Sequence, residues 1–270
     1  MSLITALPGA AAQGLIWGIM AIGVYITFRI LDIADLTVDG TLCTGGAVCI
    51  MMMLSGHNVW VSMLAATGAG LLAGLATGIF HTFMGIPAIL AGILTQLSLY
   101  SVNLKIMGKA NQAINVDKFN LLVSLRRVKG VALTQNTLFI VAIMIIILIA
   151  VLYWFFGTEL GCSLRATGCN PSMSRAQGIN TDRNKVLGLM LSNGLVALSG
   201  ALLTQYQGFA DINMGRGSIV IGLAAVIIGE AIFSRIFRNF ALKLLSVVFG
   251  SILYYLVLQI VIWMGIDTDL

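Results

Sequence analysis

Long apolar stretches separated by polar turns dominate the pattern of this chain. They run to about 20 residues without the alternation of a half-buried strand, so each predicts a helix. About 20 apolar residues is also the length that a helix needs to cross the hydrocarbon core of a bilayer. Eight such segments are present, at about residues 9–28, 40–54, 59–80, 86–104, 136–156, 186–206, 217–233 and 241–264.

The second and seventh segments are short and rich in glycine, and their sequences VDGTLCTGGAV and GRGSIVIGLAAV echo each other. They could be broken or re-entrant helices, which would raise the number of spanning helices to nine or ten. Short, glycine-interrupted spans at corresponding places in two halves mark the central pathway of many transporters. Glycine equally permits close helix packing, and the two interpretations are compatible. Thr41, Thr44 and Ser218 are therefore candidate pathway residues.

The composition places these helices in a membrane. Hydrophobic residues make up 59% of the chain and charged residues 9%, whereas a soluble domain carries about 25% charged residues. Spans that face lipid must satisfy their own backbone, which leaves helices or closed barrels. The first span lacks the basic start of a cleaved leader, so we expect it to be retained. We predict an all-α polytopic membrane protein with a single domain over residues 1–270.

Enzyme chemistry finds little support in the sequence. There is no G-x-x-x-x-G-K-[ST] motif, so the chain has no P-loop for ATP. Two histidines and ten acids leave little from which to build a catalytic set. Cys162 and Cys169 have a C-x6-C spacing without a nearby histidine, which is not a zinc pattern. We expect no enzyme activity, metal, cofactor or nucleic-acid partner, and translocation is the simplest role.

Basic residues indicate the orientation. A polar island at about 157–185 and the turn after the seventh segment are both basic, and eight spans place them on one side. The excess of Lys and Arg in short loops makes that side cytoplasmic. Both termini then lie outside, which suits the acidic tail Asp267–Asp269. The basic residues are Arg165, Arg175, Arg183 and Lys185 in the island, and Arg235, Arg238 and Lys243 in the turn.

One loop opposes this orientation. Residues 105–135 hold Lys105, Lys109, Lys118, Arg126, Arg127 and Lys129 against Asp117 alone, yet eight spans place them outside. Either the charge rule fails here, or a further short helix such as Phe119–Val128 returns the chain to the other side. We keep the loop outside, where it could meet an acidic partner or simply be solvated.

Acids near the first two spans invite a functional interpretation. Asp32, Asp35 and Asp39 follow Arg29 and would share one face of a continuous helix. Acids inside a membrane usually face a cavity or a partner. The same stretch could instead be a polar turn whose acids pair with Arg29, with Asp39 capping the next helix. Glu230 poses the same choice, because it could line a gate or pair with Arg235.

The polar island carries the most specific motif. LRATGCNPSMSRAQGIN resembles the cytoplasmic coupling region of permeases in the branched-chain amino-acid/ribose class of ABC importers. GLAAVIIGE, at residues 222–230, resembles a second stretch of these permeases, with Glu230 where they usually have glycine. DIADLTVDGTLCTGGAV resembles a branch with mostly unassigned substrates, some linked to aromatic amino acids. The residues that match the coupling motif are Leu164, Arg165, Ala166, Thr167, Asn170, Arg175, Gly178, Ile179 and Asn180.

The resemblance implies a concrete assembly. Two permease copies would form the pore, an ATPase dimer would dock on the cytoplasmic loops, and an extracytoplasmic binding protein would deliver a small solute such as an amino acid. The fold would be similar to that of the vitamin B12-type importers, with an inverted repeat. The location would be the cytoplasmic (inner) membrane of a bacterium.

Two other classes compete with this interpretation. A secondary transporter driven by an ion gradient would need an ion site in the spans, and Asp32, Asp35 and Asp39 are the candidates for it. Uptake without an ATPase that collapses with a protonophore would favour that class. A membrane scaffold or enzyme subunit is the other alternative, and copurification with an ATPase and a binding protein would count against it.

Overall fold

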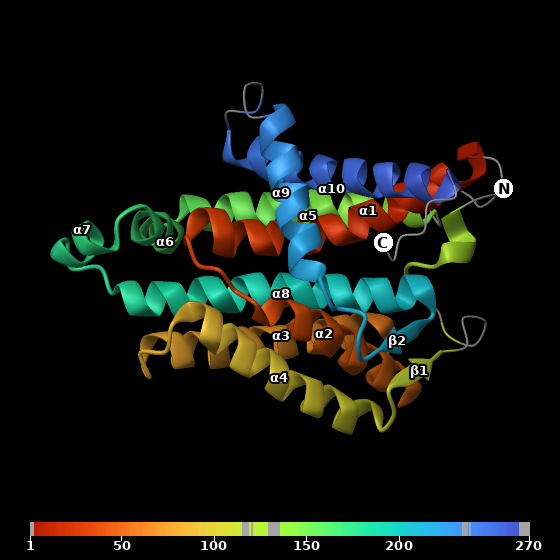
Figure 1. The fold of residues 1–270 in the computed structure, drawn as a ribbon, viewed down its shortest axis with the longest axis horizontal. Coiled ribbons are helices and arrows are strands. Elements are labelled where there is room, and N and C mark those ends of the chain that lie inside the picture. Colours follow the sequence, from red (N-terminus) through yellow and green to blue (C-terminus); the bar gives the residue numbers. More distant parts are fainter. Residues whose placement is uncertain are drawn as a thin grey trace.

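The computed structural model describes residues 3–114, 119, 121–128, 136–233, 237 and 239–264. It is a bundle of helices with one pair of three-residue strands (Figure 1). The helices are α1 (Leu3–Tyr25), a π-helical turn η1 (Ile26–Ile30), α2 (Thr37–Leu54), α3 (Val59–Thr82), α4 (Ala88–Met107), a 3-10 turn η2 (Leu125–Val128), α5 (Thr137–Gly157), α6 (Glu159–Cys169), α7 (Pro171–Ala176), α8 (Thr181–Gln207), α9 (Ser218–Phe233) and α10 (Phe240–Trp263). The strands are β1 (Asn111–Ala113) and β2 (Phe209–Asp211).

Seven helices in the described ranges are long and apolar enough to cross a bilayer, namely α1 with η1, α2, α3, α4, α5, α8 and α10. The shorter α9 accounts for the eighth apolar segment, with 16 residues. The eight predicted segments therefore each correspond to a helix, and α2 is continuous rather than broken. The two additional helices, α6 and α7, lie within the polar island 157–185. The all-α class predicted from the sequence is confirmed.

The long helices run back and forth between two ends of the bundle (Figure 1). One end holds α6 and α7, and we call it the coupling end. The other holds β1 and β2, and we call it the strand end. The first turn of α1 and the last turn of α10 both lie at the strand end. This agrees with the prediction that the chain enters and leaves on the side opposite the island. The tail Asp267–Asp269 lies outside the described residues.

The basic loop 105–135 begins and ends at the strand end. β1 pairs antiparallel with β2, with Asn111 opposite Asp211 and Ala113 opposite Phe209. The Thr137 hydroxyl, at the start of α5, donates to the Ser124 carbonyl at 2.8 Å. The alternative helix Phe119–Val128 is reduced to the single turn η2, which leaves the chain at the same end. Lys118 and Lys129 lie outside the described residues.

Glycines allow α2, α3 and α8 to pack backbone to backbone in the centre. A Cβ on Gly45 of α2 would collide with the backbone of Ala197 on α8, and one on Gly200 of α8 would collide with the carbonyl of Leu42. Gly74 of α3 lies in the same way against Leu189. In apolar surroundings this close contact supplies the dispersion energy that a hydrophobic effect between helices cannot. The packing interpretation of the glycines in segment two therefore has direct structural support.

The chain between β2 and α9 turns back into the bundle. After Asp211 it runs along α2, where the Cys43 thiol donates to the Ile212 carbonyl and the backbone of Gly215 packs against Asp39. α9 then begins beside the first turn of α2 and runs across the long helices of the bundle (Figure 1). The seventh segment is thus preceded by residues 212–217, which turn back against α2 and which we call the re-entrant stretch.

Candidate functional site

The coupling region, residues 157–185, is shaped by side chains that cap its helices. The Thr158 hydroxyl accepts from the Gly161 amide at the start of α6, at 3.4 Å. The Asn170 carboxamide oxygen accepts from the Met173 amide at 3.0 Å, and Pro171 occupies the first turn of α7. Asn180 caps α8 by accepting from the Arg183 amide at 3.1 Å. Caps and proline at these positions are strong local signals, so the sequence itself divides the island into three helices.

Gly178 ends α7 in a conformation that favours glycine. Its φ is +80°, its amide donates to the Arg175 carbonyl at 3.0 Å, and the Ile179 amide donates to the Ser174 carbonyl at 3.0 Å. This pair of bonds is a Schellman motif, which uses a left-handed residue after the helix. A Cβ on Gly178 would meet no atom within 4 Å. The glycine is therefore required by the turn, and its surface is open to a partner.

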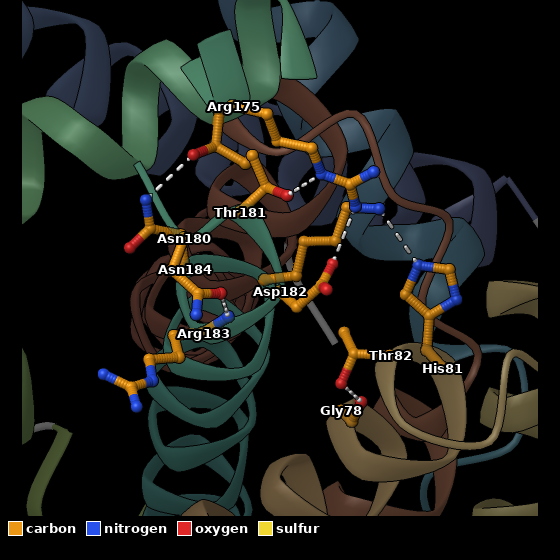
Figure 2. Close-up of polar contacts among 11 residues, drawn as sticks. Gly78, His81, Thr82, Arg175, Asn180, Thr181, Asp182, Arg183 and Asn184 are labelled. Atoms are coloured by element: carbon orange, nitrogen blue, oxygen red, sulfur yellow. Dashed lines mark hydrogen bonds and ion pairs between the residues drawn. The ribbon is translucent and has the colours of Figure 1, made fainter. Parts of the chain in front are cut away.

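Arg175 closes the turn onto the start of α8 (Figure 2). Its Nε donates to the Thr181 hydroxyl at 2.7 Å and its Nη2 to the Asp182 carboxylate at 3.0 Å. On the neighbouring helices, Lys185 Nζ of α8 lies 3.5 Å from His81 Nε2 of α3. These contacts tie the tip of the coupling region to two long helices of the bundle.

Two residues of the predicted motif are buried and hold α6 in place. Leu164 and Thr167 are each 1% exposed, and the Thr167 hydroxyl accepts from the Asn184 carboxamide at 2.8 Å. Gly168 packs directly against the Ile30 carbonyl at the end of η1. Leu164 and Thr167 therefore hold the motif in position and do not themselves face a partner.

Arg165 links α6 to two further helices. Its Nη2 donates to the Phe156 carbonyl of α5 at 2.8 Å, and its guanidinium lies 5.8 Å from the ring centroid of Phe240 on α10. Together with the contact of Gly168 with η1 and that of Thr167 with α8, this gives α6 contacts with four spanning elements. A displacement of α6 would therefore reach α1, α5, α8 and α10 at once.

The remaining motif residues face outward. Ala166, Asn170, Arg175, Gly178 and Asn180 are exposed, and Ile179 is half-buried. Met173 on α7 is 62% exposed, and sequence reasoning did not select it. An exposed apolar side chain on a polar tip, flanked by capped turns, is the kind of anchor that a soluble partner can bury.

The candidate pathway residues Asp39 and Ser218 meet at the start of α9. Asp39 Oδ1 accepts from the Ser218 hydroxyl at 2.8 Å and the Ile219 amide at 3.0 Å, and Oδ2 accepts from the Gly217 amide at 3.0 Å. Asp39 belongs to α2, so it caps a helix far along the chain rather than its own. A carboxylate at a helix N-terminus also opposes the positive end of the helix dipole. We call this contact the α2–α9 junction.

A buried polar network lies next to the junction. The Asn193 carboxamide of α8 donates to Asp35 Oδ2 at 2.7 Å and accepts from the Thr41 hydroxyl at 2.7 Å. Asp35 Oδ1 accepts from the Thr37 amide at 2.9 Å. Burial raises the pKa of Asp35 above its usual range, and the bonds from Thr37 and Asn193 oppose that rise. Asn193 was not selected from the sequence, because an amide in an apolar run carries no local pattern.

Thr41 and Ser218 are fully buried in this structure. Thr44, also buried, donates back to the Gly40 carbonyl at 3.0 Å. These hydroxyls therefore face other helices here, and their place in a pathway stays a prediction.

Asp32, Asp35 and Asp39 do not share one helical face. Residues 31–36 are not helical, so the spacing that would have aligned the three acids does not apply. Asp32 is exposed near the coupling end with a φ of +55°, whereas Asp35 is bonded to Asn193 and Asp39 to α9. The three acids therefore do not build the single ion site that a secondary transporter would need from them.

Glu230 pairs with a residue from the first span. Arg29 Nε lies 2.9 Å from Glu230 Oε1, while Arg235 lies outside the described residues. The neighbouring Gly229 packs against the Ser246 carbonyl of α10. Close packing is therefore kept at Gly229, and Glu230 connects α9 with α1. Arg29 thus pairs with Glu230 rather than with the acids of the 32–39 stretch.

A cavity of about 180 Å³ opens beside the α2–α9 junction. It lies between the start of α2, the second half of α4 and the re-entrant stretch 212–217. The side chains that give it polar character are Asp39, Gln96, Tyr100, Asn103 and Arg216. In the part of the chain that is described, no group of three or more His, Cys, Asp or Glu residues could hold a metal ion.

Comparisons with known proteins agree with the motif. A family model described as "Branched-chain amino acid transport system / permease component" matches residues 7–270. The chain is 39% identical over 259 residues to a tyrosine transport system permease protein of Clostridioides difficile, over 96% of this chain and 84% of that protein. It is also 39% identical over 269 residues to an uncharacterized protein of Rickettsia prowazekii, over 98% of this chain and 90% of that protein.

Among solved structures, PsaBC from Streptococcus pneumoniae in complex with Fab is similar at a TM-score of 0.45 and 18% sequence identity. The similarity covers 96% of this chain and 91% of that chain. We draw no conclusion from a structural similarity this low.

Proposed function

Because this chain belongs to the family of branched-chain amino acid transport system permease components, and is thus a membrane subunit of an ATP-driven importer, we propose that its coupling region is where the ATPase docks. The observation that carries the proposal is the construction of α6 and α7. They are capped and bonded from within, and they expose Asn170, Met173 and Arg175 at the end of the molecule (Figure 1).

The contacts of α6 suggest how closure of the ATPase would move the spanning helices. Rigid packed elements move as bodies, because interfaces between them hold discrete arrangements rather than deforming continuously. Arg165, Thr167 and Gly168 connect α6 to α5, α8 and η1. Closure of an ATPase dimer on α7 would therefore tilt several spans together.

We propose a homodimer as the membrane unit. Each chain has one coupling region, whereas an ATPase dimer offers two docking sites, so two chains are needed unless a related permease completes the pair. In α4 and α5 only 22% of the apolar window is buried, against 72% in α2 and α8. The outer helices therefore leave surface for a second copy as well as for lipid. The mass of the purified complex tests this, and one permease chain per two ATPases would contradict it.

We propose that the translocation pathway for the solute runs past the α2–α9 junction. α2 and α9 start at one point, joined through Asp39, and their sequences echo each other. This supports an inverted repeat in which the two helices are counterparts. A small solute such as an amino acid, delivered by an extracytoplasmic binding protein at the strand end, is the proposed substrate. Its support is the similarity to the tyrosine transport system permease protein of Clostridioides difficile.

Reconstitution tests the proposed function. The permease, its ATPase and its binding protein would be placed in vesicles with the binding protein outside, and uptake of labelled L-tyrosine and L-leucine would be measured. We expect uptake that needs ATP inside and resists a protonophore. The matched control is the same complex with Gly178→Val, which should keep its assembly and show severalfold lower coupled ATP hydrolysis. Uptake that persists without the ATPase and collapses with the protonophore would favour a secondary transporter instead.

A further inference from the structure

The cavity beside the α2–α9 junction combines opposite charges in a small space. Asp39 lines it from α2, and Arg216 lines it from the re-entrant stretch. Within the described residues, the Arg216 guanidinium makes no hydrogen bond or ion pair, and Arg216 is exposed. Because Arg216 is exposed at this cavity, its guanidinium is available to a ligand there. The cavity is thus lined by the Asp39 carboxylate, which is bonded to the start of α9, and by the Arg216 guanidinium, which is bonded to none of the described residues.

Asn103 gives an independent observation at the same place. It also lines the cavity and is 1% exposed. Its Nδ2 donates to the Gly40 carbonyl at 3.4 Å, and its Oδ1 is buried without a hydrogen-bond partner in the described part of the chain. A buried polar atom left unsatisfied costs about 1–3 kcal/mol, and native proteins hold few of them. The free acceptor is what a ligand donor in the cavity would satisfy.

The surroundings restrict what the cavity can open onto. The exposed side chains of α4 before the cavity are apolar, among them Leu90 and Leu94, whereas Gln96 and Tyr100 border the cavity itself. A charged pair facing hydrocarbon would be unfavourable, so the cavity must open on water or on protein. Its volume of about 180 Å³ is below the roughly 300–1,000 Å³ of pockets for drug-sized ligands. A small polar solute fits these limits.

We propose that this cavity is a subsite for the α-ammonium and α-carboxylate groups of a transported amino acid, with the carboxylate beside Arg216 and the ammonium beside Asp39 and Asn103. The inference rests on the proposed function and adds to it the residues that recognise the substrate. Arg216 supplies a planar donor that suits a carboxylate. Asn103 and Asp39 supply acceptors for an ammonium group, which has three donors. The side chain of the amino acid is left to the rest of the pathway.

Ligand protection of a cysteine at the cavity tests the subsite without the binding protein. Gln96→Cys is made in a chain whose four native cysteines are replaced, and the permease–ATPase complex is treated with a small charged methanethiosulfonate. The rate of labelling is measured with L-tyrosine, L-leucine, tyramine, which lacks the carboxylate, and 3-(4-hydroxyphenyl)propionate, which lacks the ammonium. Ser98→Cys, exposed on the same helix and outside the cavity, is the matched control.

We expect both amino acids to slow labelling of the Gln96→Cys chain several-fold, while neither one-ended analogue does so at the same concentration and the Ser98→Cys chain is unaffected. Arg216→Gln should raise the half-protecting concentration about tenfold, because a charge-assisted bond is lost. Asn103→Leu should raise it as well. Lys109→Gln, exposed at the strand end, should leave it unchanged.

Several outcomes would overturn the subsite. They are equal protection by tyramine, no protection at saturating amino acid, no effect of Arg216→Gln, or a Gln96→Cys chain that no reagent reaches. The proposed function is judged separately by ATP-driven uptake in vesicles. Uptake with no protection would remove the subsite alone, whereas protection without ATP-driven uptake would remove the proposed function and leave the subsite.

Discussion

The coupling region and the α2–α9 junction solve the same problem in opposite ways. Both must satisfy the free amides at the start of a helix. In the coupling region each cap lies three residues before the amide it serves, as Asn170 does for Met173 and Asn180 for Arg183. At the junction the cap is Asp39, and its amides belong to residues 217 and 219. The first region folds from local information, whereas the second exists only when distant helices have packed.

Because of this difference, we expect the two regions to differ in how well they tolerate substitutions. Most residues of the coupling region are exposed at the end of the bundle, where solvent can replace a lost bond. The junction lies between α2 and α9, where Ser218 is buried and Asp39 is half-buried, so solvent replaces a lost bond less readily. We therefore expect substitutions at the junction to lower the free energy of unfolding, and substitutions in the coupling region to lower coupling while the fold persists.

The largest effect is expected from Gly45→Ala. The added Cβ would collide with the backbone of Ala197, so α2 and α8 would have to separate. Overpacking in a core costs about 1–3 kcal/mol and occasionally more, and we expect about 3 kcal/mol because the obstacle is backbone. The measurement is thermal unfolding of the purified chain in detergent. Gly68→Ala on α3, where a Cβ would meet nothing within 4 Å, is the control. Equal stability of the two variants would contradict the close packing.

Asp39→Ala should have the next largest effect. It removes three acceptor bonds from the start of α9, and loss of a cap costs about 0.5–2 kcal/mol. Because three bonds are lost together and Ser218 is buried, we expect about 2 kcal/mol of lost stability in the same unfolding assay. Asp32→Ala, at an exposed acid of the same stretch, should stay close to wild type. A large loss at Asp32 with none at Asp39 would reverse the comparison.

Gly178→Val should separate folding from coupling. A β-branched residue at a φ of +80° is strained by about 1–2 kcal/mol, but the strain is confined to the turn after α7. We expect normal assembly and a fall of severalfold in transport-coupled ATP hydrolysis. Gly178→Asn is the control, since asparagine tolerates the left-handed conformation, and it should retain most coupling. Unchanged coupling in an assembled Gly178→Val complex would remove the main support for docking at this turn.

The smallest signal is expected from thiol labelling at the junction itself. Thr41→Cys and Ser218→Cys are made with Cys43 and Cys49 replaced. Both positions are buried here, so labelling by a membrane-impermeant reagent should be slow without nucleotide and should rise when ATP is supplied. Protection in every nucleotide state, with transport intact, would mean that the junction only packs helices and that the pathway lies elsewhere.

The sequence predicted those parts of the fold whose signals are local. Apolar length indicated the eight membrane helices, long and short. The sequence also suggested, through their echo, that segments two and seven belong together, but it offered no means to identify the bond between them.

What could not be predicted depends on contacts across the chain. The three acids of the 32–39 stretch were placed on one helical face, because nothing local shows that residues 31–36 leave the helix to pack under α6 and α8. Arg235 was predicted as a partner of Glu230, because only the folded bundle brings Arg29 within reach. Asn193 and Asn103 gave no signal at all, because each is a single amide in an apolar run whose partners lie on other helices.

The cap at Asp39 also has a consequence for biosynthesis. The Ile219 amide is made 180 residues after Asp39, which at about 5–20 residues per second takes roughly 10–40 seconds on the ribosome. During that interval α2 is inserted with a carboxylate that lacks its amides, and such a group is unfavourable in hydrocarbon. We expect a nascent chain stopped at residue 210 to be removed by membrane proteases faster than the same chain with Asp39→Ala, as pulse-labelling can measure. A nascent permease would then become resistant to these proteases once α9 has been made.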